Sequence, residues 1–290
     1  MNQTFGEALQ RASFCLREAG LVQPRFEAEI LLASLFNDDR VKLITCQDDL
    51  LEEATRLRYE EMIRRRTKKE PVAYITGEKY FYGRKFFVNR NVLIPRPETE
   101  LLVEQALRWS QSCLKSKDKL QILDLGTGCG NLAISLALEL PLAEVWAVDI
   151  SRAALETAGA NADFHQVTKR IHFLESNYFN AFKGLTAPLF DLIVSNPPYI
   201  SSKEMTSLPG SVVDYEPHQA LNGGRDGLDA FRKILTDLEG YARKPTVLLL
   251  EIGANQQVAV GRLFRESRAF RLIGWRVDLS GRPRLYFGVI

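Results

Sequence analysis

The stretch Leu120–Gly130, LQILDLGTGCG, decides the fold class of this chain. Leu120–Leu125 is a short apolar run with the length of a buried strand, and the glycine turn follows it directly. The segment 131–139 then predicts a helix, so the chain passes from strand to helix through the glycines. Glycines suit such a turn because no Cβ atom obstructs an approaching ligand. The stretch therefore predicts the opening strand, turn and helix of a nucleotide-binding α/β fold.

Strand and helix patterns alternate on the carboxyl side of this stretch. The predicted strands lie at 145–150, 171–174, 189–195 and 247–250, and the predicted helices near 152–162, 228–241 and 255–267. Repeated βα units predict a mostly parallel, doubly wound sheet with helices on both faces. The last two strand patterns, 270–277 and 284–289, have no helix between them, so we expect an antiparallel hairpin at one edge. The expected fold class is α/β and Rossmann-like.

The amino side of the chain reads as helical. Thr4 and Glu7 form a capping box at the start of the first helix, and two further helical patterns follow before residue 70. The aromatic segment after Glu78 predicts a β-hairpin that turns at Gly83. We therefore expect three parts, which are an N-terminal helical bundle that docks the substrate at 1–75, a hairpin linker at 76–95 and a catalytic domain at 96–290.

Composition and charge narrow the class of protein. The 290 residues are 46% apolar and 26% charged, with a formal net charge of +2, which is typical of a globular protein and not of a nucleic-acid binder. No run of 18 apolar residues and no apolar leader is present, so we expect a cytoplasmic protein without a membrane span. Cysteines and histidines lack metal-ligand spacing, which favours reduced thiols and no metal site. The thiols are Cys15, Cys46, Cys113 and Cys129.

Two aspartates flank the glycine turn. Asp149 ends the next predicted strand, where a carboxylate can accept hydrogen bonds from both hydroxyls of a ribose. Asp124 lies two residues before Gly126, and we expect it to meet a cationic group such as an amino-acid ammonium. The glycine spacing is GxGxG and not the GxGxxG of dinucleotide-binding domains, which argues against NAD. A tight βα turn without a ligand is the alternative for this loop taken alone.

The predicted strand at 189–195 leads directly into Asn196-Pro197-Pro198-Tyr199. Two prolines fix φ and remove two backbone donors, so the turn presents acceptors, namely the Asn196 side-chain oxygen and the Pro197 carbonyl. Two acceptors at a fixed separation suit both hydrogens of a planar NH2 group, and Tyr199 can lie against its flat face. Ligands of open α/β sheets bind at this edge, where the glycine turn also lies. The turn therefore predicts a site that orients an amide-like nitrogen, and a merely rigid loop is the alternative.

These motifs resemble those of the peptide chain release factor glutamine methyltransferases, and the resemblance covers nearly the whole chain. It extends to Ile94–Glu100, Gly223–Leu228 and Glu251–Gly253. It implies a class I methyltransferase fold and S-adenosylmethionine as the methyl donor. It also implies methylation of the side-chain nitrogen of the glutamine in the Gly-Gly-Gln motif of class 1 release factors. We expect these release factors as protein partners, no direct nucleic-acid partner, and a monomer.

The resemblance gives each motif a role. Asn196, Pro197 and Tyr199 are expected to be catalytic, and these residues with Pro198 are expected to bind the substrate glutamine. Tyr178 falls where the family usually has an aromatic residue beside the adenine, although Ser176-Asn177-Tyr178 replaces the Ser-Asp-Trp of many relatives. The residues expected to bind S-adenosylmethionine are Asp124, Gly126, Thr127, Gly128, Cys129, Gly130, Asp149, Asn177, Tyr178 and Asn196.

Three alternatives stay open. An N6-adenine DNA methyltransferase carries a similar turn and flips its base into such a pocket. Its best support is the basic run Arg64–Lys69 and the C-terminal series Arg262, Arg265, Arg268 and Arg271, although a solvated helix face is the more common meaning of such runs. A glutamine methyltransferase acting on a ribosomal protein is poorly separated by these motifs. A non-catalytic binding module is disfavoured because every acceptor of the turn is present.

Overall fold

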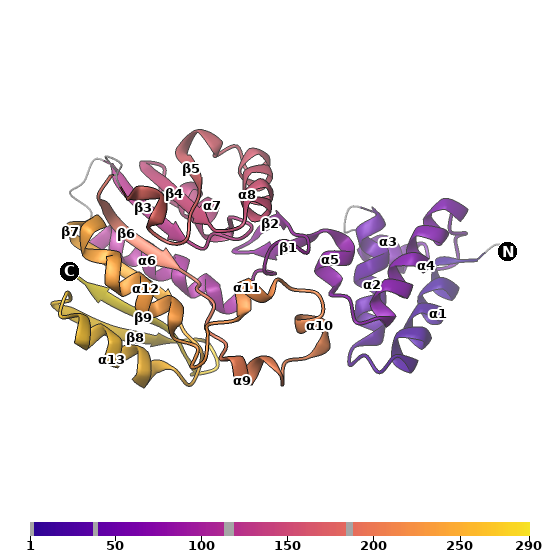
Figure 1. Cartoon of the computed structure of the whole chain (residues 1–290). Helices are drawn as coiled ribbons and strands as arrows, with labels where there is room; N and C mark the ends of the chain where they lie inside the picture. Colours follow the sequence, from indigo (N-terminus) through magenta and orange to yellow (C-terminus); the bar gives the residue numbers. More distant parts are fainter. Residues whose placement is uncertain (1–2, 37–39, 113–118, 184–187) are drawn as a thin grey trace. The chain divides into compact units, whose positions relative to one another are not determined.

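The computed structural model describes residues 3–36, 40–112, 119–183 and 188–290 (Figure 1). Cys113 lies outside these residues. The chain divides into two compact units. One unit holds the residues up to Glu78 together with Pro209–Tyr215, and the other holds Lys79–Leu208 and Glu216–Ile290.

The first unit is helical. The capping box is confirmed, since the Glu7 backbone N–H donates to Thr4 Oγ1 over 3.2 Å and the Thr4 N–H donates to Glu7 Oε2 over 2.9 Å. Leu16 and Leu31 are fully buried in its core. Its elements are α1 (Phe5–Glu18), α2 (Pro24–Ala33), η1 (Ser34–Phe36), α3 (Arg40–Thr45), α4 (Glu53–Thr67), α5 (Val72–Thr76) and α10 (Gly210–Val213). Tyr215 Oη donates to the Lys68 carbonyl over 2.7 Å, which attaches the α10 segment to this unit.

The second unit contains, within the described residues, a seven-stranded sheet of order β5-β4-β3-β6-β7-β9-β8. Its strands are β3 (Leu120–Leu125), β4 (Ala143–Asp149), β5 (Ile171–Glu175), β6 (Phe190–Ser195), β7 (Ala242–Glu251), β8 (Leu272–Val277) and β9 (Pro283–Val289). The pairs among β3 to β7 are parallel, whereas β9 runs antiparallel to both β7 and β8. The doubly wound sheet and its antiparallel edge hairpin are confirmed.

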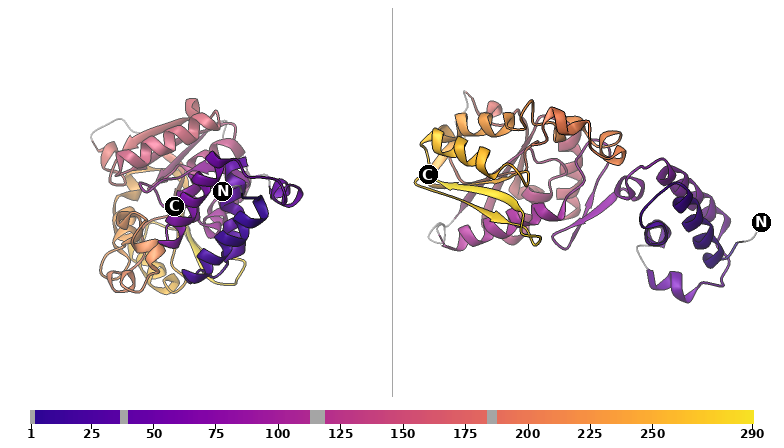
Figure 2. Two further views of the ribbon diagram at one scale, coloured as in Figure 1. Left: turned by 90° about the vertical axis from the view of Figure 1, so that its right-hand side faces the viewer. Right: turned by 90° about the horizontal axis from the view of Figure 1, so that it is seen from below.

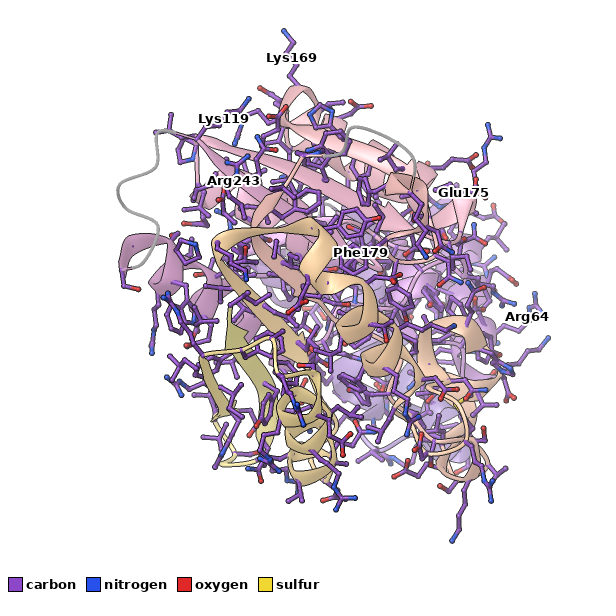
Figure 3. The ribbon with its side chains drawn as sticks, turned by 60° about the vertical axis from the view of Figure 1, so that its left-hand side comes forward. Arg64, Lys119, Lys169, Glu175, Phe179 and Arg243 are labelled. Carbon is purple, nitrogen blue, oxygen red and sulfur yellow. The ribbon has the colours of Figure 1, made fainter. Side chains whose placement is uncertain are left out.

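Helices cover both faces of this sheet (Figures 1 and 2). Side chains alternate along β3, so Ile122 enters one core while Leu123 and Leu125 enter the other. The first core is closed by α6 (Glu100–Ser112), α7 (Asn131–Glu139) and α8 (Arg152–Phe164), and the second by α12 (Asp229–Asp237) and α13 (Gln257–Ser267). Phe179, labelled in Figure 3, is fully buried in the second core and stacks on Tyr241 at 4.8 Å. Burial on both faces explains why the parallel strands read as continuous apolar runs.

A β-hairpin and several short helices complete the chain. The hairpin of β1 (Glu78–Phe81) and β2 (Arg84–Phe87) turns at Tyr82 and Gly83, both at positive φ, as a tight hairpin turn requires. The short helices are η2 (Pro97–Thr99), η3 (Thr168–Arg170), η4 (Asn180–Phe182), α9 (Ser202–Met205), α11 (His218–Leu221) and η5 (Leu238–Tyr241). The sequence patterns gave no helix between 201 and 222, because a helix of four residues is too short to display a 3.6-residue period.

Candidate active site

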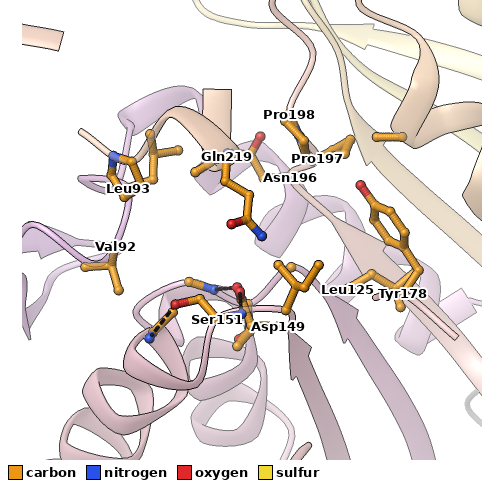
Figure 4. Close-up of a pocket in the computed structure, with 18 of the residues that line it drawn as sticks. Val92, Leu93, Leu125, Asp149, Ser151, Tyr178, Asn196, Pro197, Pro198 and Gln219 are labelled. Carbon is orange, nitrogen blue, oxygen red and sulfur yellow. Dashed lines mark hydrogen bonds between the residues drawn. The ribbon is translucent and has the colours of Figure 1, made fainter. Parts of the chain in front are cut away.

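A cavity of about 390 Å³ lies at the carboxyl ends of the central strands (Figure 4). Its volume is within the range of small-molecule sites. Leu125 at the end of β3 pairs with Ser195 at the end of β6, and the Ser195 hydroxyl donates to the Leu125 carbonyl over 2.6 Å. The glycine turn and the Asn-Pro-Pro-Tyr turn therefore begin side by side, and both line the same cavity.

The glycine turn offers open backbone to this cavity. Gly126 and Gly128 adopt positive φ angles of 76° and 57°, and a Cβ atom added at either would meet no heavy atom within 4 Å. The N–H groups of Gly126 and Thr127 both donate to the Val148 carbonyl, which holds the turn against β4. The turn can therefore accept a ligand close to its main chain.

Asp149 lies at the end of β4, on the floor of the cavity in Figure 4. Its Oδ2 accepts from the Gly128 N–H and its Oδ1 from the Ser151 N–H, each over 2.9 Å. Burial raises the pKa of this carboxyl, and the backbone donors counter part of that rise. The side chain is held in one orientation beside the glycine turn.

Asp124 lies inside β3, one residue before the strand ends. It is fully buried and does not line the cavity. Its Oδ2 accepts from Thr127 Oγ1 over 2.6 Å and from the Ala133 N–H over 3.2 Å, while Oδ1 has no partner among the described residues. Burial raises the pKa of this carboxyl to about 7. The observed contacts hold the glycine turn to α7, and contact with a ligand ammonium stays a prediction.

Asn177, Tyr178 and Cys129 all line the cavity. Tyr178 has a φ of 53°, a rare angle for an aromatic residue, and Ser176 Oγ donates to its carbonyl over 2.6 Å. Burial raises the pKa of the Cys129 thiol to about 12, so this thiol stays protonated near neutral pH and is unsuited to act as a nucleophile.

Asn196, Pro197 and Pro198 form the opposite wall of the cavity (Figure 4). Asn196 Nδ2 donates to Thr99 Oγ1 over 3.1 Å, and Asn196 Oδ1 accepts no hydrogen bond from the described residues. Tyr199 does not line the cavity. Its ring packs against the second core, and its hydroxyl donates to Glu251 Oε1 over 3.2 Å. Stacking of Tyr199 on a substrate amide stays a prediction.

The Gly223–Gly227 segment packs against the Asn-Pro-Pro-Tyr turn. The Gly223 N–H donates to the Ile200 carbonyl over 2.8 Å. A Cβ atom added at Gly223 would lie 2.7 Å from the Pro198 carbonyl oxygen, and one added at Gly227 would lie 2.4 Å from the Tyr199 carbonyl oxygen. Only glycine permits this close packing, so the segment fixes the main chain of the turn.

Two further residues line the cavity that no sequence pattern assigned to the site. Arg96 lines the cavity and pairs with buried Glu216, with 2.5 Å between Nη2 and Oε1. Gln219 of α11 projects into the cavity between Asn196 and Asp149 in Figure 4. These residues come together only through tertiary folding, although Arg96 lies in one of the segments that carried the family resemblance.

The sheet order, the glycine turn and the proline-rich turn together define a class I methyltransferase. Two sequence profiles match, the PrmC N-terminal domain over residues 7–77 and the methyltransferase small domain over residues 103–214. A release factor glutamine methyltransferase of Koribacter versatilis is 37% identical over 99% of this chain and 98% of its own length. One of Chlorobaculum tepidum is 40% identical over 91% and 90%. The chain belongs to the release factor glutamine methyltransferase family.

Further relatives are longer, and the solved structures are more distant. A bifunctional methyltransferase of Rickettsia conorii is 36% identical over 98% of this chain, which spans only 57% of that relative. The human METTL16 catalytic domain, solved with an RNA hairpin, superposes with a TM-score of 0.58 at 11% identity, covering 89% of this chain and 91% of that one. A Pyrococcus furiosus methyltransferase gives 0.51 at 13% identity, covering 79% and 98%. These likenesses support the fold.

The cavity fits S-adenosylmethionine, the methyl donor of this class. The open backbone at Gly126 and Gly128 leaves room for a ligand, and the Asp149 carboxylate offers acceptors for a pair of hydroxyls. Tyr178 supplies an aromatic surface at the same cavity. Across the ranges that the structure describes, we find no cluster of three or more metal-ligating side chains and no helix suited to cross a membrane.

The two arginine clusters differ in their contacts. In α4, Arg64 pairs with Glu61, Arg65 with Glu70, and Arg66 with Glu27 of α2. Arg64 nevertheless projects outward (Figure 3). Four arginines of the C-terminal series are exposed and form no carboxylate pair within the described part of the chain, namely Arg262, Arg265, Arg268 and Arg271. The α4 cluster is therefore largely neutralised by its own unit.

Proposed function

We propose that this chain transfers a methyl group from S-adenosylmethionine to the side-chain nitrogen of the glutamine in the Gly-Gly-Gln motif of class 1 release factors. The observation that carries the proposal is the state of Asn196. Its Nδ2 is engaged by Thr99, which leaves Oδ1 as a hydrogen-bond acceptor on the wall of the cavity. The relatives named release factor glutamine methyltransferases, similar over nearly their whole length, support glutamine as the acceptor.

The main task of the protein in this reaction is to align the amide nitrogen with the methyl group of the donor. S-adenosylmethionine supplies an electrophilic methyl group on a sulfonium, whereas an amide nitrogen is a weak nucleophile because its lone pair is delocalised. Asn196 Oδ1 and the Pro197 carbonyl would hold the two amide hydrogens and aim the nitrogen, an effect that can lower a barrier by up to about 7–11 kcal/mol. The same acceptors would stabilise the positive charge that develops on nitrogen.

The remaining site residues would bind S-adenosylmethionine. Asp149 would accept hydrogen bonds from the ribose hydroxyls, and the main chain of Gly126 to Gly130 would face the donor. Asn177 and Tyr178 would contact the adenine. Asp124 would act mainly through the glycine turn, which it holds to α7. Its Oδ1, which has no partner among the described residues, would be the atom that accepts from the ammonium group of the donor.

The helical part would dock the release factor. We assign residues 1–75 to docking, 76–95 to a linker and 96–290 to catalysis, in a cytoplasmic monomer that acts on protein and not on nucleic acid. The internal pairing of Arg64, Arg65 and Arg66 supports a protein partner, because arginines held by carboxylates of their own unit attract phosphates weakly. We interpret the exposed C-terminal arginines as a solvated surface, the more common meaning of such a series.

Peptide mass spectrometry tests the proposal. The chain is incubated with S-adenosylmethionine and a purified class 1 release factor, and the peptide containing Gly-Gly-Gln is fragmented. We expect one added methyl group on the glutamine side chain, and no product when that glutamine is replaced by asparagine. Methylation only of a ribosomal protein, or only of DNA adenine, would refute the proposed substrate in favour of one of the alternatives.

A further inference from the structure

Two buried residues outside the Asn-Pro-Pro-Tyr turn connect both of its ends. Thr99 in η2 is 1% exposed and Glu251 at the end of β7 is 2% exposed. Thr99 Oγ1 donates to Glu251 Oε2 over 2.6 Å and accepts from Asn196 Nδ2 over 3.1 Å. Tyr199 Oη donates to Glu251 Oε1 over 3.2 Å. A single carboxylate therefore holds the first residue of the turn through Thr99 and the last residue directly.

The direction of these hydrogen bonds sets the orientation of the Asn196 amide. An ionised carboxylate can only accept, so the one hydroxyl hydrogen of Thr99 must point to Glu251. The Thr99 oxygen is then available only as an acceptor toward Asn196. Asn196 must present Nδ2 to it, and the opposite atom of the amide, Oδ1, remains as the acceptor on the cavity side.

We propose that Glu251, acting through Thr99, is a positioning residue that makes Asn196 Oδ1 the acceptor for the substrate amide and fixes the ring of Tyr199. This inference rests on the proposed function of the turn. Loss of the Thr99 hydroxyl or of the carboxylate would free the Asn196 amide to rotate. In the rotated state Asn196 would present its own NH2 group to the NH2 group of the substrate amide. Two donors cannot hydrogen-bond to each other.

Whether Asn196 Oδ1 faces the cavity then depends on the charge of Glu251. A protonated Glu251 can donate to Thr99, which lets Thr99 donate to Asn196 and turns the amide over. The groups that face Glu251 are the hydroxyls of Thr99 and Tyr199 and the charges of Arg284 and Glu98. Burial, with a small contribution from Glu98, raises the pKa of Glu251 to about 7, although Thr99, Tyr199 and Arg284 oppose that rise. The productive orientation should therefore be gained as pH rises through about 7.

The test uses the full chain, a class 1 release factor and three variants. Thr99→Val keeps the shape and removes the hydroxyl, and it should lower kcat by about 10- to 100-fold, as a misaligned reactant does. Its affinity for S-adenosylmethionine by calorimetry should stay unchanged, and it should still unfold cooperatively well above the assay temperature, which separates positioning from unfolding. Its thermal midpoint should fall by a few degrees, because Glu251 and Asn196 each lose a buried hydrogen bond. Thr99→Ser keeps the hydroxyl and should recover most of kcat. The kcat of the unaltered chain should rise through pH 7, and Glu251→Gln should remove that rise.

A second readout does not depend on turnover. The chain is labelled with 13C at the glutamate carboxyls, and the NMR signal of Glu251 is assigned by its loss in Glu251→Gln. This signal should titrate near pH 7 in the unaltered chain. The midpoint of the titration should shift in Thr99→Val. Absence of any methyl transfer by the unaltered chain would refute the proposed function and leave this titration as the test of the network. Unchanged kcat in Thr99→Val, equal losses in Thr99→Ser and Thr99→Val, or a titration identical in both chains would overturn the inference.

Discussion

The two turns that line the cavity begin on neighbouring strands and are built in opposite ways. The turn after β3 consists largely of glycines at positive φ and offers its main chain to a ligand. The turn after β6 contains two prolines and offers the side chain of Asn196, which Thr99 holds from a distant part of the chain. The hydrogen bond from Ser195 to the Leu125 carbonyl fixes the start of one turn against the other.

This difference between the two turns shows which residues each binding function depends on. A main-chain site depends on residues adjacent in sequence, because the glycines themselves create the opening. A side-chain site depends on whatever orients the side chain, and here that support comes from η2 and from the end of β7. The glycine turn should therefore tolerate side-chain changes that leave its main chain in place, whereas the acceptor side should respond to changes far away in the chain.

The largest expected effect is on the acceptor turn. Asn196→Ala removes the amide acceptor and should lower kcat by about 100- to 1000-fold, the loss seen when one stabilising group of a polar site is deleted. The affinity for S-adenosylmethionine should change much less than kcat. Turnover and donor calorimetry measured on the same preparation separate the two, and a kcat equal to that of the unaltered chain would remove Asn196 from the mechanism.

The matching change on the donor side is Asp149→Ala. Removing a carboxylate that accepts from the ribose should weaken donor binding by about 10- to 100-fold, the equivalent of one or two charged hydrogen bonds. kcat at saturating donor should fall less, because the acceptor turn is untouched. Calorimetry with S-adenosylmethionine gives the dissociation constant, and an unaltered constant would contradict the ribose assignment.

A smaller effect should follow from Gly227→Ala. Gly227 has a φ of 76°, and the added Cβ would lie 2.4 Å from the Tyr199 carbonyl oxygen. Overpacking of this kind costs about 1–3 kcal/mol of stability, and the displaced turn should also lose kcat. Denaturant unfolding with parallel kinetics is the measurement. A variant as stable and active as the original would show that the Gly223–Gly227 segment does not fix the turn.

The smallest effect is expected within the glycine turn itself. Cys129→Ala removes a buried thiol that is protonated near neutral pH, so it should cost about 1 kcal/mol of stability, as ordinary small core changes do. Donor affinity and turnover should both persist, because this turn acts through its main chain. Loss of turnover at an unchanged fold would mean that the thiol takes part in the chemistry.

Much of the fold could be predicted from sequence because its signals are local. The β3 strand, the glycines and α7 are consecutive, and the edge hairpin showed as two strand patterns without a helix between them. Three helical patterns were predicted before residue 70, and α1, α2 and α4 account for them, whereas the shorter α3 and α5 were missed. Helices of five or six residues contain too few turns to show a periodic apolar face.

The site could be predicted only where it is continuous in sequence. Both turns were identified, but the cavity excludes Gly130, Asp124 and Tyr199. The side chains of Asp124 and Tyr199 hydrogen-bond to Thr127 and Glu251 instead. Thr99 and Glu251 lie 152 residues apart, so no spacing could reveal their hydrogen bond. The orientation of the Asn196 side chain depends on contacts between residues far apart in the chain. Both supporting residues, Thr99 and Glu251, nevertheless lie in segments that carried the family resemblance.

In the proposed mechanism, Asn196 holds the glutamine amide by its side-chain oxygen. A crystal structure of the chain with S-adenosylhomocysteine and a Gly-Gly-Gln peptide tests it most directly. We expect the glutamine nitrogen within about 2.7–3.2 Å of Asn196 Oδ1, while Asn196 Nδ2 stays on Thr99 Oγ1. A glutamine amide bound elsewhere in the cavity, or an Asn196 whose oxygen faces Thr99, would contradict it.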